Sequence, residues 1–238
     1  MTTSLHFHSN RKIPQHDTVN WDQIQRTPIQ DNHNALIKID QHNQGNLILH
    51  PYYFYQQMTG ASTDFYIREE VLEKLHLASK NLPQGIHLML LDSWRPYTLQ
   101  AALVESFNAE ISQRYPNCSA LEKQKILSLF VSAPSLDPQQ PSPHMTGGSV
   151  DVTLCDDNGN PLDLGTAFDS PVEQSWTAAL EITAEHSAQQ LRRILYWAMI
   201  DAGFSNLPSE WWHFDFGNQL WAYFKQQPHA HYLGIAAL

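Results

Sequence analysis

Residues 142–154, SPHMTGGSVDVTL, decide how the rest of the chain is interpreted. From position 149 onward apolar and polar residues alternate, which predicts a β-strand with one apolar face and one polar face. The two glycines just before it permit a sharp turn, so His144 and Asp151 could converge although they are separated in sequence. A glycine turn leading into an ordinary edge strand with an exposed aspartate explains this stretch equally well.

Upstream, the sequence predicts helices and one buried strand. Residues 86–91, IHLMLL, form a short apolar run that is typical of a strand buried on both faces. Before this strand, apolar residues at helical spacing from Ile67 to Ala78 predict one helix. A second helix is predicted after Pro96, because proline suits a first helical turn, and a third over residues 120–131.

Downstream, a loop, a hairpin, a helix and a last strand are expected. Residues 132–143 carry four prolines, which exclude a helix interior or a central strand there. Asn158-Gly159 is typical of a hairpin turn. A helix is predicted over residues 187–202 and a strand over residues 211–216. Together the elements favour an α+β fold, in which a mainly antiparallel sheet is flanked by helices.

The chain length of 238 residues fits a single domain. We expect this domain to span residues 1–238, with residues 1–27 and 226–238 as peripheral extensions. About the first 60 residues are expected to run as an extended segment around the domain.

Composition argues against several classes of protein. Lys and Arg number 14 against 24 Asp and Glu, and the resulting net charge of −10 argues against a nucleic acid partner. No apolar run approaches the roughly 18 residues of a membrane span, so no membrane partner is expected. Cys118 and Cys155 are too few for a disulfide scaffold. Because no signal sequence is visible at the N-terminus, we expect a cytoplasmic location, with a periplasmic one as the less favoured alternative.

A second stretch whose residues could carry catalytic chemistry is residues 209–214, SEWWHF. Its aromatic residues would lower the local dielectric, raise the pKa of Glu210 and suit that carboxyl to proton transfer near neutral pH. In a regular strand Glu210 and His213 would face opposite sides, so they share a site only if Glu210 lies in a turn that enters the strand. For this stretch alone, a buried strand with a hydrogen-bonded core histidine is the simpler explanation.

Taken together, the two stretches supply two histidines and one carboxylate: His144, Asp151 and His213. Such a set suits a catalytic zinc ion with three protein ligands and an open coordination position. Glu210 would transfer protons beside the zinc ion. Arg95, which follows the buried strand, would stabilise a developing oxyanion. A structural salt bridge to Asp92 is the alternative role for Arg95, and the two roles are compatible.

Three motifs, in this order, resemble those of the D-alanyl-D-alanine dipeptidases, zinc peptidases best known from vancomycin resistance: Asp92-x-Trp-Arg95-Pro, Ser142-x-His144-x-x-Gly147-x-x-x-Asp151 and Glu210-Trp-Trp-His213. The resemblance spans about residues 28–225. It implies the fold that this family shares with murein D,D-carboxypeptidases and the hedgehog signalling domain. Ser149 stands where the family often has alanine, which is a small change on the polar strand face.

The resemblance also implies a function. A zinc metallopeptidase of this family holds one zinc ion per chain. It hydrolyses D-alanyl-D-alanine, a small free dipeptide of cell-wall peptidoglycan metabolism, to two D-alanines. His144, Asp151 and His213 would then be the zinc ligands. Glu210 would act as general base and acid toward metal-activated water, and Arg95 would stabilise the transition state.

Two substrate contacts also follow from the resemblance, in loops whose lengths differ from those of the family. Asp169 would bind the free ammonium group of the dipeptide, and Ser142 would lie near its carboxylate. A turn or helix N-cap role for Asp169 and a plain loop position for Ser142 are the alternatives. Asp92, Trp211 and Trp212 are expected to stand behind the residues that contact metal or substrate.

Two other functions stay open. A D,D-carboxypeptidase or another murein peptidase would use the same fold and metal site but would leave the amino side of its pocket open. A zinc-binding module without turnover is the second, although the presence of both Glu210 and Arg95 argues against it. The sequence does not determine the oligomeric state, the native metal or the physiological role.

Overall fold

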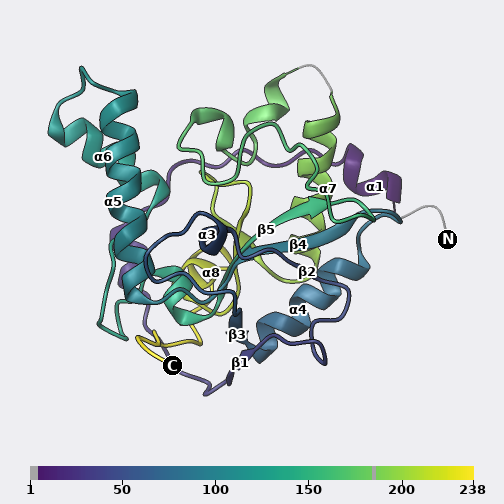
Figure 1. The fold of residues 1–238 in the computed structure, drawn as a ribbon, viewed down its shortest axis with the longest axis horizontal. Coiled ribbons are helices and arrows are strands. Elements are labelled where there is room, and N and C mark those ends of the chain that lie inside the picture. The colour runs from purple at the N-terminus through teal and green to yellow at the C-terminus, as the bar shows by residue number, and fades with distance from the viewer. Residues whose placement is uncertain (1–4, 184–185) are drawn as a thin grey trace.

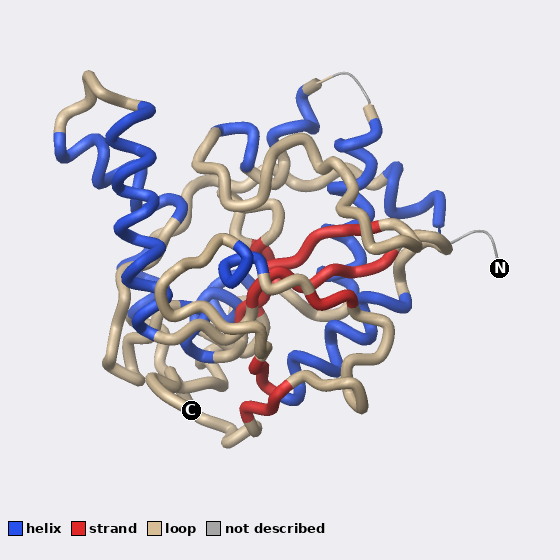
Figure 2. Tube along the Cα trace, in the orientation of Figure 1, coloured by secondary structure: helices blue, strands red, loops and turns tan. Residues whose placement is uncertain are grey.

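A five-stranded sheet lies at the centre of the computed structural model, which describes residues 5–183 and 186–238 (Figure 1). Its strands are, in spatial order, β2 (Ile48–Leu49), β4 (His87–Asp92), β5 (Ser149–Cys155), β7 (His213–Asp215) and β6 (Ser205–Asn206). β2 runs parallel to β4, whereas β4–β5, β5–β7 and β7–β6 pair antiparallel. A smaller sheet, below the main one in Figure 2, pairs β1 (Leu36–Lys38) with β3 (Tyr66–Arg68).

Helices surround this sheet and complete the predicted α+β fold. In the described part of the chain, the α-helices are α1 (Leu5–Asn10), α2 (Trp21–Gln25), α3 (Tyr52–Tyr55), α4 (Glu69–Lys80), α5 (Tyr97–Arg114), α6 (Ala120–Phe130), α7 (Ser187–Asp201) and α8 (Gln219–Phe224). Short 3-10 helices are η1 (Pro143–Thr146), η2 (Glu173–Ser175) and η3 (Ala179–Ile182). The prediction of a mainly antiparallel sheet is corrected to a mixed sheet, because its edge strand β2 runs parallel to β4.

One face of the main sheet packs against α4 and α7 (Figure 1). Val150 and Val152 of β5 are completely buried in an apolar cluster with Val71 of α4 and Leu195 of α7. The alternation predicted for β5 is therefore confirmed, and the apolar face of this strand packs against the two helices. The opposite parity, which includes Asp151, points to the other face of the sheet.

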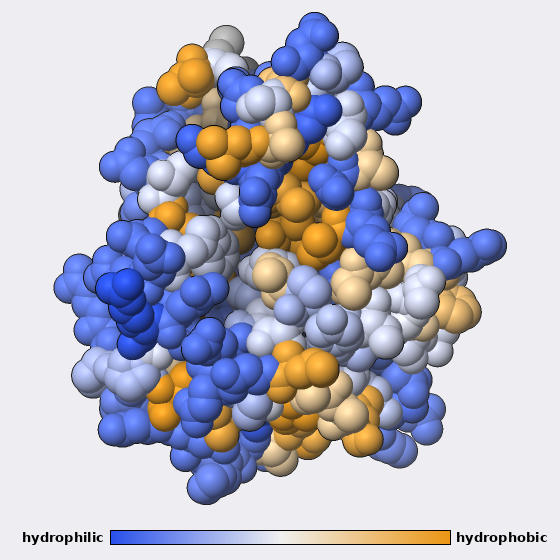
Figure 3. Space-filling view, turned by 90° about the vertical axis from the view of Figure 1, so that its left-hand side faces the viewer, coloured by the Kyte–Doolittle hydropathy of each residue, from blue (hydrophilic) through white to orange (hydrophobic). Residues whose placement is uncertain are grey.

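α5 and α6 extend outward from the sheet (Figure 1). Leu99, Leu103 and Phe107 bury one face of α5 in an apolar cluster with Phe130 of α6 and Tyr53 of α3. The helix predicted after Pro96 is thus confirmed. Figure 3 views the molecule from this side and shows hydrophobic side chains beside a hollow in a largely hydrophilic surface.

Two predicted elements begin later than expected. α4 starts at Glu69, because Ile67 belongs to β3 and pairs with Ile37 of β1. β7 starts at His213 rather than at Trp211, because the two adjacent tryptophans lie in a turn. Both differences come from pairing or turning that the local apolar spacing does not reveal.

The two end segments of the chain pack on each other and on the body of the protein. Ile13 and Ile24 are buried, and Ile29 forms a parallel bridge with the completely buried Ala230. The predicted domain limits, with peripheral extensions at both ends, stay a prediction. In residues 5–183 and 186–238, no helix has both the length and the apolar character that crossing a bilayer requires.

Candidate active site

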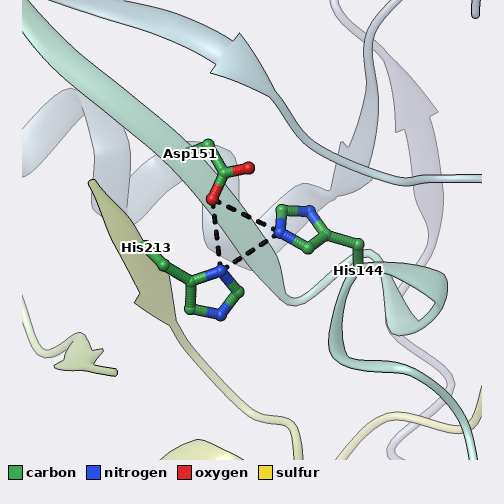
Figure 4. Close-up of side chains that lie close together, drawn as sticks. All are labelled: His144, Asp151 and His213. Carbon is green, nitrogen blue, oxygen red and sulfur yellow. Dashed lines mark hydrogen bonds and ion pairs between the residues drawn. The ribbon is translucent and has the colours of Figure 1, made fainter. Parts of the chain in front are cut away.

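Three buried side chains from different elements meet at one point (Figure 4). His144 lies on η1, Asp151 on β5 and His213 on β7, and the three point toward one another. Strand pairing joins two of them, because Asp151 and His213 are direct partners in the β5–β7 register. Gly147, with a left-handed φ of 72°, turns the chain between η1 and β5 and so brings His144 to the same place.

The facing atoms of these side chains form a nearly equilateral triangle. Nε2 of His144 lies 3.2 Å from Nδ1 of His213 and 3.4 Å from Oδ1 of Asp151. Nδ1 of His213 lies 3.2 Å from the same oxygen. Ligand atoms about 2.0–2.1 Å from a tetrahedral ion are roughly 3.3–3.4 Å apart, so the triangle matches one face of such a site. Among the residues that the structure describes, these three form the group that could hold a metal ion.

Hydrogen bonds behind the imidazoles decide which nitrogen faces the centre. Nδ1 of His144 lies 2.7 Å from the carbonyl oxygen of Ser93, which only accepts, so Nδ1 carries the proton and Nε2 presents its lone pair. Nε2 of His213 donates to Oδ1 of Asp215 at 3.1 Å, which leaves Nδ1 facing the centre. Two ring nitrogens and a carboxylate oxygen in this arrangement repel one another unless a metal ion or a proton lies between them. The residues present therefore fit a metal ion.

The electrostatics of the cluster also favour a positive charge. Burial lowers the pKa of His213, but Asp215 and Asp151 outweigh this effect and hold that pKa well above its usual value. Burial raises the pKa of Asp151, but His144 and His213 outweigh it and hold that pKa below its usual value. A cation is thus stabilised here, and metal binding would displace the proton that His213 otherwise takes up.

Asp215 is a residue of the site that sequence reasoning missed. It is completely buried, and its Oδ1 also accepts hydrogen bonds from Oγ of Ser149 and Nδ2 of Asn218, each at 2.7 Å. These bonds hold the carboxylate behind His213. The sequence does indicate Asp215, because positions 213 and 215 have the same parity and lie on one face of β7.

Arg95 lies beside Asp151, the carboxylate of the candidate metal cluster. Its Nη2 is 3.3 Å from Oδ2 of Asp151 and 2.7 Å from Oδ2 of Asp92, and its Nη1 donates to Oε1 of Gln100 at 2.9 Å. Burial lowers the pKa of this guanidinium, but Asp92 and the other nearby acids raise it above its usual value, so the charge persists. Asp92 thus makes the salt bridge that the sequence suggested and also orients Arg95. The catalytic role of Arg95 stays a prediction.

The three clustered side chains and Arg95 line one pocket of the protein. Gln100 and Tyr53 line the same pocket, and no sequence motif marks either of them. Gln100 is buried and donates from Nε2 to the carbonyl oxygen of Ser132 at 2.7 Å, so it connects Arg95 to the segment after α6. Tyr53 donates to Oδ2 of Asp169 at 2.9 Å and accepts from Nη2 of Arg95 at 3.4 Å. Both reach the site through contacts between distant parts of the chain, which local sequence patterns do not encode.

Glu210 lies in the turn before β7, where it can share a site with His213. Its Oε2 is 3.8 Å from Nδ1 of His213, and its buried side chain lines the same pocket. Burial raises the pKa of this carboxyl well above its usual range, with a further increase from Asp151 and Asp169 and an opposing effect from His213. A carboxyl of raised pKa beside a metal site suits proton transfer.

Trp211 and Trp212 are buried behind the pocket. Nε1 of Trp211 donates to Oγ1 of Thr166 at 2.8 Å. Trp212 packs edge-to-face against Phe168, with ring centroids 5.4 Å apart. Both tryptophans therefore support the loop that carries Asp169. The apolar lining of the pocket comes instead from α5, α6 and the residues that follow α6, together with Trp21 and Leu207.

Asp169 lines this pocket, whereas Ser142 lines a neighbouring groove. Asp169 has a φ of 63°, which is uncommon for a residue other than glycine. Burial and the charge of Asp151 raise its pKa to about 7. Ser142 is buried at the start of η1. The predicted substrate contacts of both residues stay predictions.

Comparisons with known proteins agree with this geometry. Residues 35–233 match the M15 family of peptidases, described as D-ala-D-ala dipeptidase. The chain is similar to a D-alanyl-D-alanine dipeptidase of Synechocystis sp., with 29% identity over 88% of this chain and 92% of that protein. It is also similar to proteins of the same name from Escherichia coli, at 31% identity over 55% of each chain, and Enterococcus faecium, at 28% identity over 68% of this chain and 82% of the other. The three motifs fall within the matched residues.

Proposed function

The chain belongs to the M15 family of D-Ala-D-Ala dipeptidases, and from this we propose that it hydrolyses D-alanyl-D-alanine to two molecules of D-alanine with one zinc ion per chain. The observation that carries the proposal is the triangle of His144, Asp151 and His213, whose facing atoms lie 3.2–3.4 Å apart. Dipeptide hydrolysis further needs a proton carrier, a stabiliser of the oxyanion and recognition of both free ends. The surrounding residues offer a candidate for each.

His144, Asp151 and His213 would hold the zinc ion. Two imidazoles and one carboxylate are typical of catalytic zinc sites that keep one position open. When bound, zinc polarises the scissile carbonyl and lowers the pKa of water. The carbonyl of Ser93 and the carboxylate of Asp215 would keep the two imidazoles oriented.

Glu210 would carry the proton. Its carboxylate would accept a proton from the attacking water and then pass it to the nitrogen of the leaving D-alanine as the peptide bond breaks. The raised pKa of the buried carboxyl supports this role, because a group that both accepts and releases a proton works best when its pKa lies above that of an ordinary glutamate.

Arg95 would donate to the oxygen of the scissile carbonyl as negative charge develops on it. Asp92 and Gln100 already hold the guanidinium in place, so little reorganisation is needed when the charge appears. The same two partners keep the guanidinium of Arg95 from forming a salt bridge with Asp151 alone.

Asp169 would pair with the free ammonium group of the dipeptide. Of the carboxyl groups that line this pocket, Asp151 is a candidate metal ligand and Glu210 lies 3.8 Å from His213, whereas Tyr53 fixes the position of Asp169 by a hydrogen bond of 2.9 Å. Ser142 would lie toward the carboxyl end of the substrate. Binding of the free amino end by Asp169 would favour a dipeptidase over a D,D-carboxypeptidase, which must leave that end open.

Metal content and activity measured on the same preparation test the proposal. We expect about one zinc ion per chain, hydrolysis of free D-Ala-D-Ala, loss of activity on chelation and recovery on addition of Zn²⁺. A muropeptide that ends in D-Ala-D-Ala separates the alternatives. Cleavage of this longer peptide alone would favour a D,D-carboxypeptidase, and zinc binding without turnover of either substrate would favour a binding module.

A further inference from the structure

Trp21 reaches the catalytic pocket from outside the part of the chain that matches the family. The match begins at residue 35, whereas Trp21 is the first residue of α2. Its half-buried side chain lines the same pocket as Arg95 and Glu210. The N-terminal segment therefore contributes one wall of the proposed active site.

Contacts with the C-terminal part of the chain hold α2 in place. Ile24 is buried in a small apolar cluster that includes α8, and Trp21 packs against this cluster. Nε2 of Gln219 donates to the carbonyl oxygens of Gln25, at 3.1 Å, and Thr27, at 2.8 Å. These contacts make Trp21 part of a fixed wall rather than of a free chain end.

A wider cavity, which we call the groove, adjoins the catalytic pocket. The groove is lined by residues of α2, the proline-rich segment after α6 and the start of α8. Its volume is about 410 Å³, against about 30 Å³ for the catalytic pocket. The residues that line both cavities are Trp21, Val131, Ser132 and Pro143. We call these four residues the partition.

The two cavities differ in the end of the substrate that each would meet. Tyr53 and Asp169, the proposed ammonium site, line the pocket but not the groove. Ser142, proposed to lie near the carboxylate, lines the groove but not the pocket. A dipeptide held at Asp169 would therefore direct its carboxyl end toward the partition. A further residue beyond that carboxylate would have to enter the groove.

We propose that Trp21 is a specificity-determining residue, which closes the carboxyl end of the catalytic pocket and restricts the substrate to a dipeptide. The inference rests on the proposed dipeptidase function and names the side chain that limits substrate length. On the side of the partition opposite Trp21, the hydrogen bond from Nε2 of Gln100 to the carbonyl oxygen of Ser132 fixes the segment after α6. The indole of Trp21 is the largest side chain of the partition, so its removal opens the most space.

Two alanine variants open the partition from its two sides. Trp21→Ala acts from α2, and Val131→Ala acts from the segment after α6. Their substrates are D-Ala-D-Ala, D-Ala-D-Ala-D-Ala, which is extended at the carboxyl end, and N-acetyl-D-Ala-D-Ala, which is blocked at the amino end. We expect Trp21→Ala to raise the ratio of kcat/KM for the tripeptide over the dipeptide roughly 10–100-fold, and Val131→Ala to raise it less. The N-acetyl dipeptide should gain in neither variant, because its added group meets Asp169.

Asp22→Ala is the matched control. Asp22 is exposed, follows Trp21 directly on α2 and lines neither cavity, so its replacement should leave the ratio unchanged. Trp21→Leu serves as a second variant, because leucine keeps apolar packing against the α8 cluster but is smaller than an indole. Thermal unfolding followed by circular dichroism shows whether each variant folds.

The outcomes separate this inference from the proposed function. Failure of the wild-type protein to hydrolyse D-Ala-D-Ala would reject the proposed function. Wild-type hydrolysis together with an unchanged tripeptide ratio in folded Trp21→Leu and Val131→Ala would reject the role of Trp21 alone. An equal gain for the N-acetyl dipeptide would also reject it, since that result indicates a general loosening of the pocket.

Discussion

Asp215 accepts a hydrogen bond from Nε2 of His213 at 3.1 Å while it is itself completely buried. A carboxylate behind a ligand histidine fixes the tautomer of the ring and raises its basicity toward the metal. Asp215→Asn keeps the shape of the side chain but removes the charge. We expect the dissociation constant for zinc to increase about 10–100-fold, as measured by competition with a chromophoric chelator.

Ser149→Ala is the control for that variant. It removes the 2.7 Å hydrogen bond from Ser149 to Asp215 but leaves the carboxylate and its charge in place. The loss of zinc affinity should therefore be smaller than in Asp215→Asn. If Asp215→Asn binds zinc as tightly as the wild-type protein, the carboxylate does not tune the metal site.

Glu210→Gln separates proton transfer from metal binding. Glutamine has the same shape as glutamate but cannot take up a proton, so kcat should fall by about 10²–10⁴-fold. The zinc content should stay at the wild-type level, because Glu210 lies outside the ligand triangle, with Oε2 3.8 Å from Nδ1 of His213. Steady-state kinetics and metal analysis of one preparation check both expectations. Turnover at the wild-type rate would remove Glu210 from the mechanism.

Local sequence patterns account for the parts of the fold that were predicted well. The strands β4 and β5 and the helices α5, α6 and α7 follow from an apolar run, from alternation or from helical spacing of residues a few positions apart. The parallel pairing of β2 with β4 has no such local cause. Ile48 pairs with Met89 only after the chain has passed through α3, β3 and α4, and a strand of two residues carries almost no pattern of its own.

The candidate site divides in the same way. His144, Asp151 and His213 stand in short motifs that glycines or aromatic residues mark, and the structure brings their side chains together. Gln100 lies in a helix predicted for its packing alone. Trp21 lies in a segment predicted to be peripheral, yet it lines the pocket because the N-terminal segment packs against α8. Such placements depend on contacts between distant segments, which a single sequence does not show.

Arg95→Lys tests whether the fixed guanidinium matters or only its charge. Lysine keeps the charge, but one ammonium group cannot keep the bonds to both Asp92 and Gln100 while it also faces the substrate. We expect kcat to fall by about 10²–10³-fold, with a smaller change in KM. Gln100→Ala, which keeps Arg95 but loosens it, should give a smaller fall. Wild-type kcat in Arg95→Lys would show that a point charge is sufficient.

Asp169→Asn tests recognition of the ammonium group. A neutral amide loses the charge-assisted contact, so KM for D-Ala-D-Ala should rise roughly 10–100-fold. In the wild-type protein, the pKa of Asp169 of about 7 means that kcat/KM should increase as the pH rises through neutrality, because only the ionised form attracts the ammonium. The variant should lose the part of this increase that Asp169 causes, which pH profiles of both proteins would reveal, whereas the raised pKa of Glu210 affects both proteins alike. A wild-type KM in the variant would place the ammonium elsewhere.

The same variant should make the folded protein more stable at alkaline pH. Burial and the charge of Asp151 raise the pKa of Asp169 from 3.8 to about 7 on folding. Because the folded pKa is the higher one, the protonated carboxyl stabilises the folded state below the unfolded pKa, and this contribution is lost as the pH rises through the folded pKa. Asp169→Asn avoids the loss, so its free energy of unfolding should exceed that of the wild-type protein by roughly 1–4 kcal/mol at pH 8 and by almost nothing at about pH 4. Denaturant unfolding of both proteins with a chelator present measures the difference, and equal stabilities at pH 8 would show that Asp169 carries no cost of burial.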